Sequence, residues 1–519
     1  MTGSSFASTR TEAVVALATK GVARFDVEGL PPGARFDYAK AAVLFRPDFT
    51  QSGPYDVTVT GHAPGFTKTV HVRIDVRDTF APPSPVVVST TPGAGYSRLL
   101  VRQSTDGVLD PPARAGRTFD AIVVVPTSAT VTDRAPVLVA QRGLGGAPNA
   151  SATSTTSFRI EPHDPNNTYW WGQSEGTSSP PAAGKVPEYT ARRVLHLVDW
   201  LKRSYPAADP DRVFMVGGSM GGAGALTIGL LHARHFAGVE ASIAPTVPRN
   251  HRPSRIAQLS GLWGAPPRTS AVCGTPWTSR ALRDDAEARD QFLFTKHGKD
   301  DPTIHFGAVV TRSALTNKSY YATVEDERIG HYAVWDEGAH GPADPVLGAG
   351  WWDASWSRVA DPKARLVRSK PFPAFSGSTA NEDPGDDKGN GSVAFNAESG
   401  FAAVLATAGD TGWGGAVAGA MNRFLRWDTT ATVDEPNKLA IPLYDVNGPG
   451  EIAPRPGYPT TRDLPGSLPI TVDVTLRRVR NFHPMPGERV PCATRSPNTA
   501  MRITRGLRLG SEAHREGGE

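Results

Sequence analysis

Cysteine is scarce in this chain of 519 residues, which contains two, Cys273 and Cys492. So few cysteines exclude a disulfide-rich scaffold and a zinc site built on cysteine. Neither sign of charge dominates, because 55 Lys and Arg residues face 51 Asp and Glu residues, a net charge of +4. Spread over this length, that balance gives no electrostatic basis for binding nucleic acid, and we expect none.

Long apolar runs are also missing. No window reaches the roughly 18 apolar residues that a membrane helix needs, so we expect no membrane span. Residues 1–6 lack the basic and apolar regions of a secretory signal peptide. The alternative that a signal peptide was removed before residue 1 stays open. Glycine and proline, in contrast, are abundant, at 53 and 46 residues. This composition favours turn-rich β structure and long ordered loops over helical bundles.

Apolar periodicity divides the chain into three expected domains. Residues 1–85 show alternation with period two, as at Tyr55, Val57 and Val59, which predicts a β-sandwich module. Residues 86–428 alternate short apolar strand patterns with amphipathic helix patterns, which predicts an α/β domain with a mostly parallel sheet. In residues 429–519 the period-two pattern returns, and predicts a small C-terminal β domain with a loose tail.

The N-terminal region carries the turn motif Gly29-Leu-Pro-Pro-Gly33, followed by the strand pattern Tyr55-Asp-Val-Thr-Val59. This order resembles the immunoglobulin-like modules that are appended to bacterial extracellular proteins. The resemblance implies an immunoglobulin-like sandwich at residues 1–85 and an extracellular or secreted protein. In that setting a disulfide between Cys273 and Cys492 is chemically permitted, and we expect the pair to be oxidised.

The sharpest chemical signal is the motif Gly217-Gly-Ser-Met-Gly221. It follows an apolar strand pattern at 209–216 and precedes a helix pattern at 223–232, which is the context of a nucleophile elbow. In such an elbow the serine is held in a strained backbone conformation, and flanking glycines avoid a steric clash. We therefore expect Ser219 to be a nucleophile. The alternative is an idle serine in a glycine-rich turn.

A serine nucleophile needs a base and a carboxylate that orients the base. His340 lies in a Gly-Ala-His-Gly loop after a strand pattern and is the expected general base, with a surface histidine as the alternative. Asp300 and Asp301 follow the strand pattern at 292–296 and are the candidate carboxylates. Asp336 is a weaker third candidate.

Two backbone N–H groups are expected to form an oxyanion hole. One belongs to Met220, the residue directly after the nucleophile. The other belongs to the loop 141–146, whose glycines allow a sharp turn towards the substrate carbonyl. We assign this second donor to Leu144, with Gly143 as the alternative.

Residues 95–345 resemble α/β-hydrolases of the esterase and prolyl-oligopeptidase-like clan. The resemblance rests on the segments 141–146, 209–222, 297–302 and 338–342. The segment 209–222 is similar to feruloyl esterases, related carbohydrate esterases and secreted polyester depolymerases. The resemblance implies a Ser–His–Asp acyl-transfer mechanism without a cofactor. The family's His-Gly-x-x-Asp loop places the carboxylate at Asp301, counted from His297. Arg142 is a departure, because the family usually has histidine at this position.

A long segment, 147–188, separates the oxyanion loop from the next helix pattern. Long loops in compact domains are usually functional or disordered. Its aromatic residues Tyr169, Trp170 and Trp171 are expected either to line a substrate-binding wall or, equally, to fix the segment to the core. Trp351, Trp352 and Trp356 are expected to pack in the core. His163 and Asp164 have no third partner at metal-ligand spacing, so no metal is expected.

Three functions remain open. The leading hypothesis is a secreted carboxylic ester hydrolase that acts on a polymeric or polymer-linked ester. The second is a serine peptidase of the prolyl-oligopeptidase type, although such enzymes usually carry an N-terminal propeller that residues 1–85 are too few to build. The third is a non-catalytic binding protein on an inactive hydrolase scaffold, against which Ser219, Asp301 and His340 argue.

Overall fold

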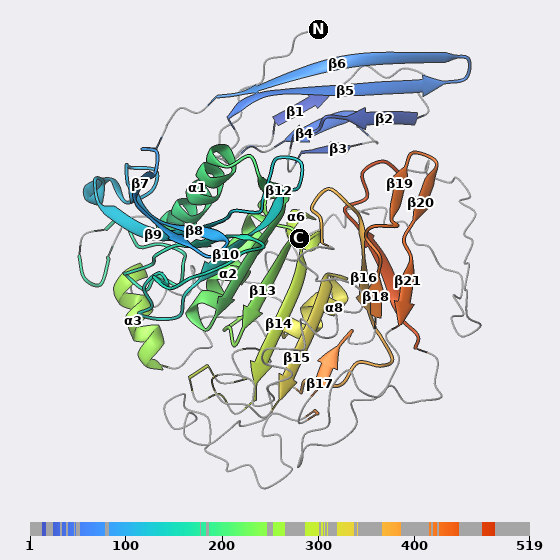
Figure 1. Ribbon diagram of the computed structural model, residues 1–519. Helices are drawn as coiled ribbons and strands as arrows, with labels where there is room; N and C mark the ends of the chain where they lie inside the picture. The colour runs from blue at the N-terminus through green and yellow to red at the C-terminus, as the bar shows by residue number, and fades with distance from the viewer. Residues whose placement is uncertain are drawn as a thin grey trace.

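The computed structural model contains two small N-terminal sheets and a large mixed sheet with helices packed on it (Figure 1). The residues that the structure describes are 13–16, 24–31, 34–37, 40–45, 47, 52–77, 82–176, 178–182, 186–246, 253–264, 286–299, 301, 303–304, 306, 309, 319–336, 340, 366–385, 415–416, 419–422, 425–445 and 470–482. The predictions on Cys273, Cys492, Trp351, Trp352 and Trp356 concern residues outside these ranges.

Six N-terminal strands form two antiparallel sheets, with the orders β1-β4-β3 and β2-β5-β6. The strands are β1 (Ala13–Ala16), β2 (Arg24–Glu28), β3 (Arg35–Asp37), β4 (Ala42–Phe45), β5 (Gly53–Ala63) and β6 (Phe66–Val76). Phe36 and Val43 of one sheet share an apolar cluster with Val57 and Val59 of the other. Two sheets around one core form a β-sandwich arrangement. Its immunoglobulin-like identity stays a prediction.

The large sheet has ten strands in the order β17-β15-β14-β13-β12-β10-β11-β9-β8-β7. The strands are β7 (Val86–Gly93), β8 (Tyr96–Ser104), β9 (Thr118–Pro126), β10 (Ala135–Gln141), β11 (Phe158–Glu161), β12 (Ala208–Gly218), β13 (Gly238–Ser242), β14 (Phe292–Gly298), β15 (Gly330–Asp336) and β17 (Gly419–Met421). The six strands from β11 to β15 in this order pair in parallel, and antiparallel strands flank them. The exchange of β10 and β11 relative to chain order is typical of α/β-hydrolases, so the predicted fold class is confirmed.

Five α-helices are described: α1 (Tyr189–Ser204), α2 (Met220–Leu231), α3 (Pro253–Trp263), α6 (Ala286–Arg289) and α8 (Tyr320–Asp326). Helix α1 buries one apolar stripe, formed by Val194, Leu197, Val198 and Leu201, as in the amphipathic helix patterns expected of this region. Helix α2 is buried from Met220 to Leu230, as expected for a helix that is apolar all round. No helix in the described part of the chain is both long and apolar enough to cross a membrane.

Successive side chains of a strand point to opposite faces of the sheet, and so separate two cores. In β12, Val213 joins the cluster that contains α1 and α2, whereas its neighbour Phe214 joins a second cluster with Phe372 and Trp427. In this second cluster, side chains of the large sheet pack against chain segments from Leu366 onward. The C-terminal part of the chain therefore covers one face of the hydrolase sheet.

Six strands after β15 lie outside the large sheet, and two of their pairs cross the expected domain boundary at 428. They are β16 (Phe372–Ser376), β18 (Leu425–Trp427), β19 (Val433–Glu435), β20 (Lys438–Ala440), β21 (Leu443–Asp445) and β22 (Asp473–Arg477). β16 pairs with β22, and β18 pairs with β21. In Figure 1 most of these strands, in orange and red, lie on the side of the large sheet away from β7. The described C-terminal strands are thus joined to the middle region by hydrogen-bonded ladders, and the predicted domain limits stay predictions.

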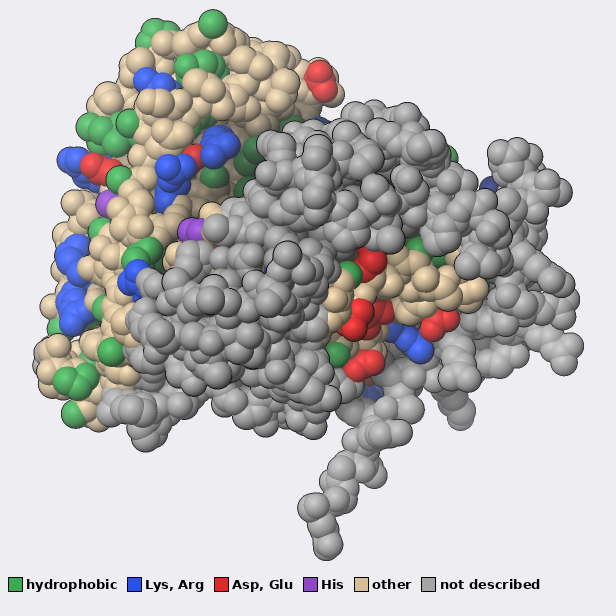
Figure 2. Space-filling model, turned by 90° about the horizontal axis from the view of Figure 1, so that it is seen from below, with side chains coloured by type: hydrophobic (Ala, Val, Ile, Leu, Met, Phe, Trp, Pro, Cys, Tyr) green, Lys and Arg blue, Asp and Glu red, His purple; other side chains and the backbone are tan. Residues whose placement is uncertain are grey.

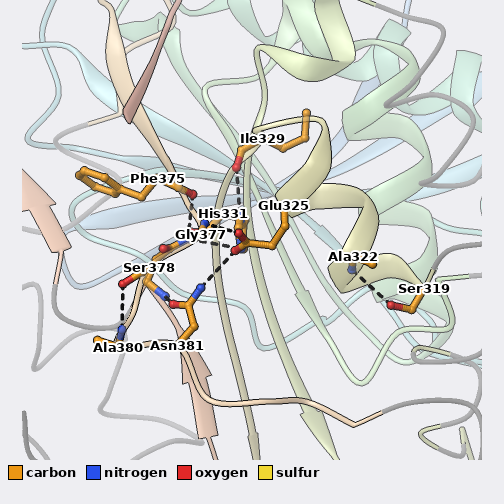
Figure 3. Close-up of polar contacts among 11 residues, drawn as sticks. Ser319, Ala322, Glu325, Ile329, His331, Phe375, Gly377, Ser378, Ala380 and Asn381 are labelled. Atoms are coloured by element: carbon orange, nitrogen blue, oxygen red, sulfur yellow. Dashed lines mark hydrogen bonds and ion pairs between the residues drawn. The ribbon is translucent and has the colours of Figure 1, made fainter. Parts of the chain in front are cut away.

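A partly buried polar cluster ties this C-terminal region to the large sheet (Figure 3). Glu325 of α8 lies 3.2 Å from His331 Nε2 of β15, and the side-chain amide of Asn381 donates to Glu325 Oε1 at 3.2 Å. The backbone N–H of Gly377 donates to the other carboxylate oxygen. Burial alone would raise the pKa of Glu325, but the contacts with His331, Gly377 and Asn381 together lower it. The ionised carboxylate therefore stabilises the packing of β16 on β15.

We predict that Glu325→Gln lowers the melting temperature at pH 7 by several degrees, equivalent to about 1–3 kcal/mol, because the buried His331 and the donors of Asn381 and Gly377 lose a charged acceptor. Since folding lowers this pKa, the contribution is fully present above the unfolded pKa of about 4.3 and is lost as pH falls through the folded value. The difference between variant and parent, followed by circular dichroism, should therefore narrow towards acidic pH.

The matched control is Glu435→Gln, because Glu435 is exposed on β19. It should leave the melting temperature unchanged. A Glu325→Gln variant as stable as the parent at pH 7, or a deficit that does not vary with pH, would contradict the assigned role of the carboxylate.

Candidate active site

Ser219 lies at the tight turn between β12 and α2, with φ 59° and ψ −125°. Two glycines make this turn possible through close backbone approaches. A Cβ at Gly217 would lie 2.1 Å from the carbonyl oxygen of Gly221, and a Cβ at Gly221 would lie 2.1 Å from the carbonyl oxygen of Gln141. The Ser219 N–H donates to the Ser242 carbonyl at 2.9 Å. The motif therefore packs against two neighbouring strands, which hold Ser219 in the left-handed region.

Ser219, His340 and Asp301 form a continuous hydrogen-bonded chain. His340 Nε2 lies 3.0 Å from Ser219 Oγ, and His340 Nδ1 lies 2.8 Å from Asp301 Oδ2. The carboxylate accepts the Nδ1 proton, which leaves Nε2 free to accept the hydroxyl proton of the serine. The structure thus brings together three residues that lie far apart in the sequence, in the geometry that serine activation needs.

Asp301 follows β14 and is 1% exposed. Its Oδ1 accepts the backbone N–H groups of Thr303 at 2.7 Å and Ile304 at 2.9 Å, while Oδ2 faces His340. Both oxygens are therefore occupied, and the carboxylate cannot rotate without losing hydrogen bonds. Of the rival carboxylates, Asp300 and the side chain of Asp336 lie outside what the structure describes.

His297, four residues before Asp301, packs in the core. It is 2% exposed; its Nε2–H donates to the Ala244 carbonyl at 3.0 Å, and its Nδ1 accepts from the Tyr321 hydroxyl at 3.2 Å. Burial lowers the pKa of His297 to about 4, so the ring stays neutral at physiological pH. The ring supports the end of β14. Both of its nitrogens are used in these contacts, so it does not serve as the base for Ser219 in this geometry.

The predicted oxyanion loop forms a tight turn beside Ser219. The Gly146 N–H donates to the Gly143 carbonyl at 3.0 Å, and Gly145 adopts φ 70°. A Cβ at Gly143 would lie 3.7 Å from Ser219 Cβ, which places this loop against the nucleophile. Within the described ranges, no protein group accepts from the backbone N–H of Leu144 or of Met220. Both predicted donors are therefore available to a substrate oxygen.

The aromatic residues of the long segment have a packing role. Tyr169 and Trp170 are 2% and 1% exposed, so neither offers a surface to substrate in this structure. A Cβ at Gly224 of α2 would lie 2.4 Å from the Trp170 indole, which shows how closely the ring packs on that helix. Trp171 is partly buried against the core and donates from Nε1 to the Val186 carbonyl at 2.9 Å. The prediction of a substrate wall is corrected for Tyr169 and Trp170 in favour of the alternative, that they fix the segment to the core.

This segment also holds the oxyanion loop, a role that no sequence pattern indicated. Asn167 Oδ1 accepts the Gly145 N–H at 2.6 Å, and Trp170 Nε1 donates to the Arg142 carbonyl at 3.3 Å. The two contacts lie on either side of Leu144. They fix the direction of the peptide groups around the expected second oxyanion donor.

The turn that presents Asn167 and Trp170 is strained and is held by Asp164. Asn167 and Trp170 have φ values of 52° and 64°. The buried Asp164 accepts the backbone N–H groups of Thr168 at 2.8 Å and Trp170 at 3.1 Å. Burial raises the pKa of Asp164, and the nearby charge of Arg193 opposes this increase. The Asp-Pro-Asn-Asn sequence could have indicated a turn, but not the loop to which the turn attaches.

Metal-ligating side chains do not gather in the described part of the chain, where no group of three or more His, Cys, Asp or Glu residues could hold an ion. The arrangement therefore offers nucleophilic chemistry at Ser219, a base at His340 and two backbone donors. Together with the sheet order, the strand-to-helix elbow defines the chain as an α/β-hydrolase.

Residues 113–341 match the model of the esterase family, whose description is "Putative esterase". The match covers less than half of the chain and includes Ser219, Asp301 and His340. It confirms the predicted enzyme class, a carboxylic ester hydrolase. No curated protein sequence matches the chain.

Solved structures resemble the chain only distantly. An S-formylglutathione hydrolase from Agrobacterium tumefaciens is 17% identical with a TM-score of 0.35, and the match covers 49% of this chain and 92% of that chain. A ferulic acid esterase is 16% identical with a TM-score of 0.34, covering 47% and 91%. An acylaminoacyl peptidase from Pyrococcus horikoshii is 13% identical with a TM-score of 0.34, covering 60% and 52%. At such scores the functions of these proteins do not transfer to the chain.

We predict that Asn167→Ala lowers kcat for ester hydrolysis by about 10- to 100-fold with little change in KM, because the oxyanion loop loses an anchor beside Leu144. Asn167→Asp keeps an acceptor for the Gly145 N–H and should restore part of the rate. Steady-state kinetics and melting temperatures of both variants provide the test.

Asn149→Ala is the matched control, because among the described residues its side chain contacts just the nearby Ser151 N–H, at 3.0 Å. Its kcat should equal that of the parent. An Asn167→Ala enzyme with parental kcat would show that this anchor does not position the oxyanion loop.

Proposed function

We propose that the chain hydrolyses carboxylic esters through an acyl-enzyme formed on Ser219. His340 takes the hydroxyl proton as Ser219 attacks the ester carbonyl, and Asp301 holds the imidazole tautomer and stabilises the imidazolium that forms. His340 then returns the proton to the leaving alcohol. Water hydrolyses the acyl-enzyme by the same path in reverse, with His340 again as the base.

The backbone N–H groups of Met220 and Leu144 are proposed to bind the oxyanion of the tetrahedral intermediate. Met220 starts α2, so the dipole of this helix also favours negative charge at that point. Gly143 lies next to Ser219 and remains the alternative to Leu144. A donor that is fixed before the reaction stabilises developing charge without reorganisation cost, and the contact from Asn167 serves that purpose.

The observation that carries this proposal is the pair of contacts made by His340, at 3.0 Å to Ser219 Oγ and 2.8 Å to Asp301 Oδ2. His340 is partly exposed, whereas Asp301 is buried. A substrate can therefore approach the serine side of the imidazole while the carboxylate side stays shielded from water.

We propose a polymeric or polymer-linked ester as substrate and an extracellular setting. Two features support this proposal: the separate N-terminal β-sandwich, which suits a spacer or binding module, and the similarity of 209–222 to feruloyl esterases and polyester depolymerases. A peptidase of the prolyl-oligopeptidase type is the competing function. The described N-terminal strands, two sheets of three strands each, do not form propeller blades.

The test is hydrolysis of short and long p-nitrophenyl esters beside an amino-acid p-nitroanilide. We expect ester cleavage without anilide cleavage, and a loss of at least about 10³-fold in kcat on Ser219→Ala. Asp301→Asn should cost about 10³- to 10⁴-fold, since the amide favours the wrong imidazole tautomer.

Ser128→Ala is the control variant, because Ser128 lies on the loop before β10, at the end of that strand away from Ser219, and its hydroxyl donates to the Thr155 carbonyl on the segment before β11. It should retain full activity. Ester turnover that persists in Ser219→Ala would remove the assignment of the nucleophile, and anilide cleavage that depends on Ser219 would favour the peptidase.

A further inference from the structure

We propose that Arg142 forms an anion-binding subsite beside Ser219, so that the enzyme prefers esters that carry a carboxylate near the scissile bond. The inference rests on the proposed function and adds a substrate class to it. It is carried by the place of Arg142 in the oxyanion loop, by a buried carboxylate beneath it and by the free donors of its guanidinium.

The backbone of Arg142 is fixed at the nucleophile. Its carbonyl accepts from Trp170 Nε1 at 3.3 Å, and a Cβ at Gly221 would lie 2.8 Å from the same carbonyl oxygen. The next residue, Gly143, borders Ser219. A Cβ at Gly146 would lie 2.9 Å from Arg142 Cβ, so the glycine leaves room for the arginine side chain. The Arg142 side chain therefore extends from a fixed backbone position, directly before Gly143, the residue that borders Ser219.

A fully buried carboxylate, Glu161, sets the direction of this side chain. Glu161 ends β11 and is 0% exposed; its Oε1 accepts from Arg159 Nε at 2.6 Å. Its Oε2 has no hydrogen-bond partner among the described residues and lies 4.0 Å from Arg142 Nη1. The attraction at this distance holds the guanidinium near the end of β11 without a hydrogen bond.

The N–H donors of the Arg142 guanidinium make no hydrogen bond to the described residues around it, and the side chain is 42% exposed. Two arginines share one carboxylate, so the group of Arg142, Arg159 and Glu161 carries a net charge of +1. A planar guanidinium with free donors is suited to bidentate binding of a carboxylate.

Figure 2 views the molecule from the end to which β13, β14 and β15 point. On the described part of that face, most Lys and Arg side chains lie on one side and a group of Asp and Glu side chains lies on the other. The inference therefore rests on Arg142 itself and not on the charge of the whole face. An arginine side chain reaches roughly 6–7 Å from its Cα, so a substrate carboxylate a few bonds from the ester carbonyl can meet it.

The carboxylate can belong to the acyl or to the alcohol part of the substrate, and two pairs of probes separate these cases. For the acyl side the pair is the mono-p-nitrophenyl ester of adipic acid and neutral p-nitrophenyl hexanoate. For the alcohol side it is p-acetoxybenzoate and its neutral methyl ester. The readout in each pair is the ratio of kcat/KM for the anionic ester to kcat/KM for the neutral ester.

We expect Arg142→Gln to lower this ratio about tenfold in at least one pair, mainly through KM of the anionic ester, and added salt to weaken the preference of the parent enzyme. Arg142→Lys keeps the charge and should restore part of the ratio. The matched control is Arg102→Gln, since Arg102 is an exposed arginine paired with Asp120 on β8 and β9. It should leave the ratio unchanged.

A purely structural role of Arg142, such as support of the oxyanion loop through Glu161, would lower both members of a pair equally. An unchanged ratio in both pairs would therefore overturn the subsite. This failure is distinct from failure of the proposed function, because the neutral esters alone report whether turnover depends on Ser219.

Discussion

Ser219 has a backbone conformation that a residue with a side chain rarely adopts, and the geometry of the site depends on the packing that keeps it there. That packing is backbone against backbone. Gly217 meets the first turn of α2, and Gly221 meets the carbonyl of Gln141 at the end of β10. Any side chain at either glycine would push apart β12, α2 and β10. The same contacts place the hydroxyl, the start of α2 and the oxyanion loop next to one another.

Around this elbow, each functional group is held by a second set of polar contacts. Asp301 is fixed by two backbone N–H groups, so that it presents one oxygen to His340. The oxyanion loop is held by Asn167 and Trp170, whose own turn is fixed by Asp164. Asn167 and Trp170 lie more than twenty residues away from the loop residues they hold, Gly145 and Arg142. Preorganisation here is therefore a property of the long segment after β10 as much as of the catalytic loops.

Local sequence patterns predicted the parts of this protein that depend on periodicity and on short motifs. The buried strands, the apolar stripe of α1 and the strand-to-helix position of Ser219 follow from residues that are neighbours in the chain. The sequence left open whether Tyr169 and Trp170 line a binding wall or pack in the core, because aromatic side chains are typical of both environments. It also missed Asn167 as the anchor of Gly145, since that contact depends on how two loops fold against each other. The pairing of β22 with β16 was not predicted either, because nearly one hundred residues separate the two strands and no local pattern links them.

The central claim is that Ser219 is the nucleophile that His340 and Asp301 activate. Its most direct test is mass spectrometry of the intact, folded protein after reaction with diethyl p-nitrophenyl phosphate, which traps activated serines covalently. We expect one diethylphosphoryl group per chain, located on the peptide that contains Ser219. We also expect strongly slowed labelling in His340→Ala and Asp301→Ala variants that remain folded. Absence of labelling in the folded parent, or equal labelling of a Ser219→Ala variant, would contradict it.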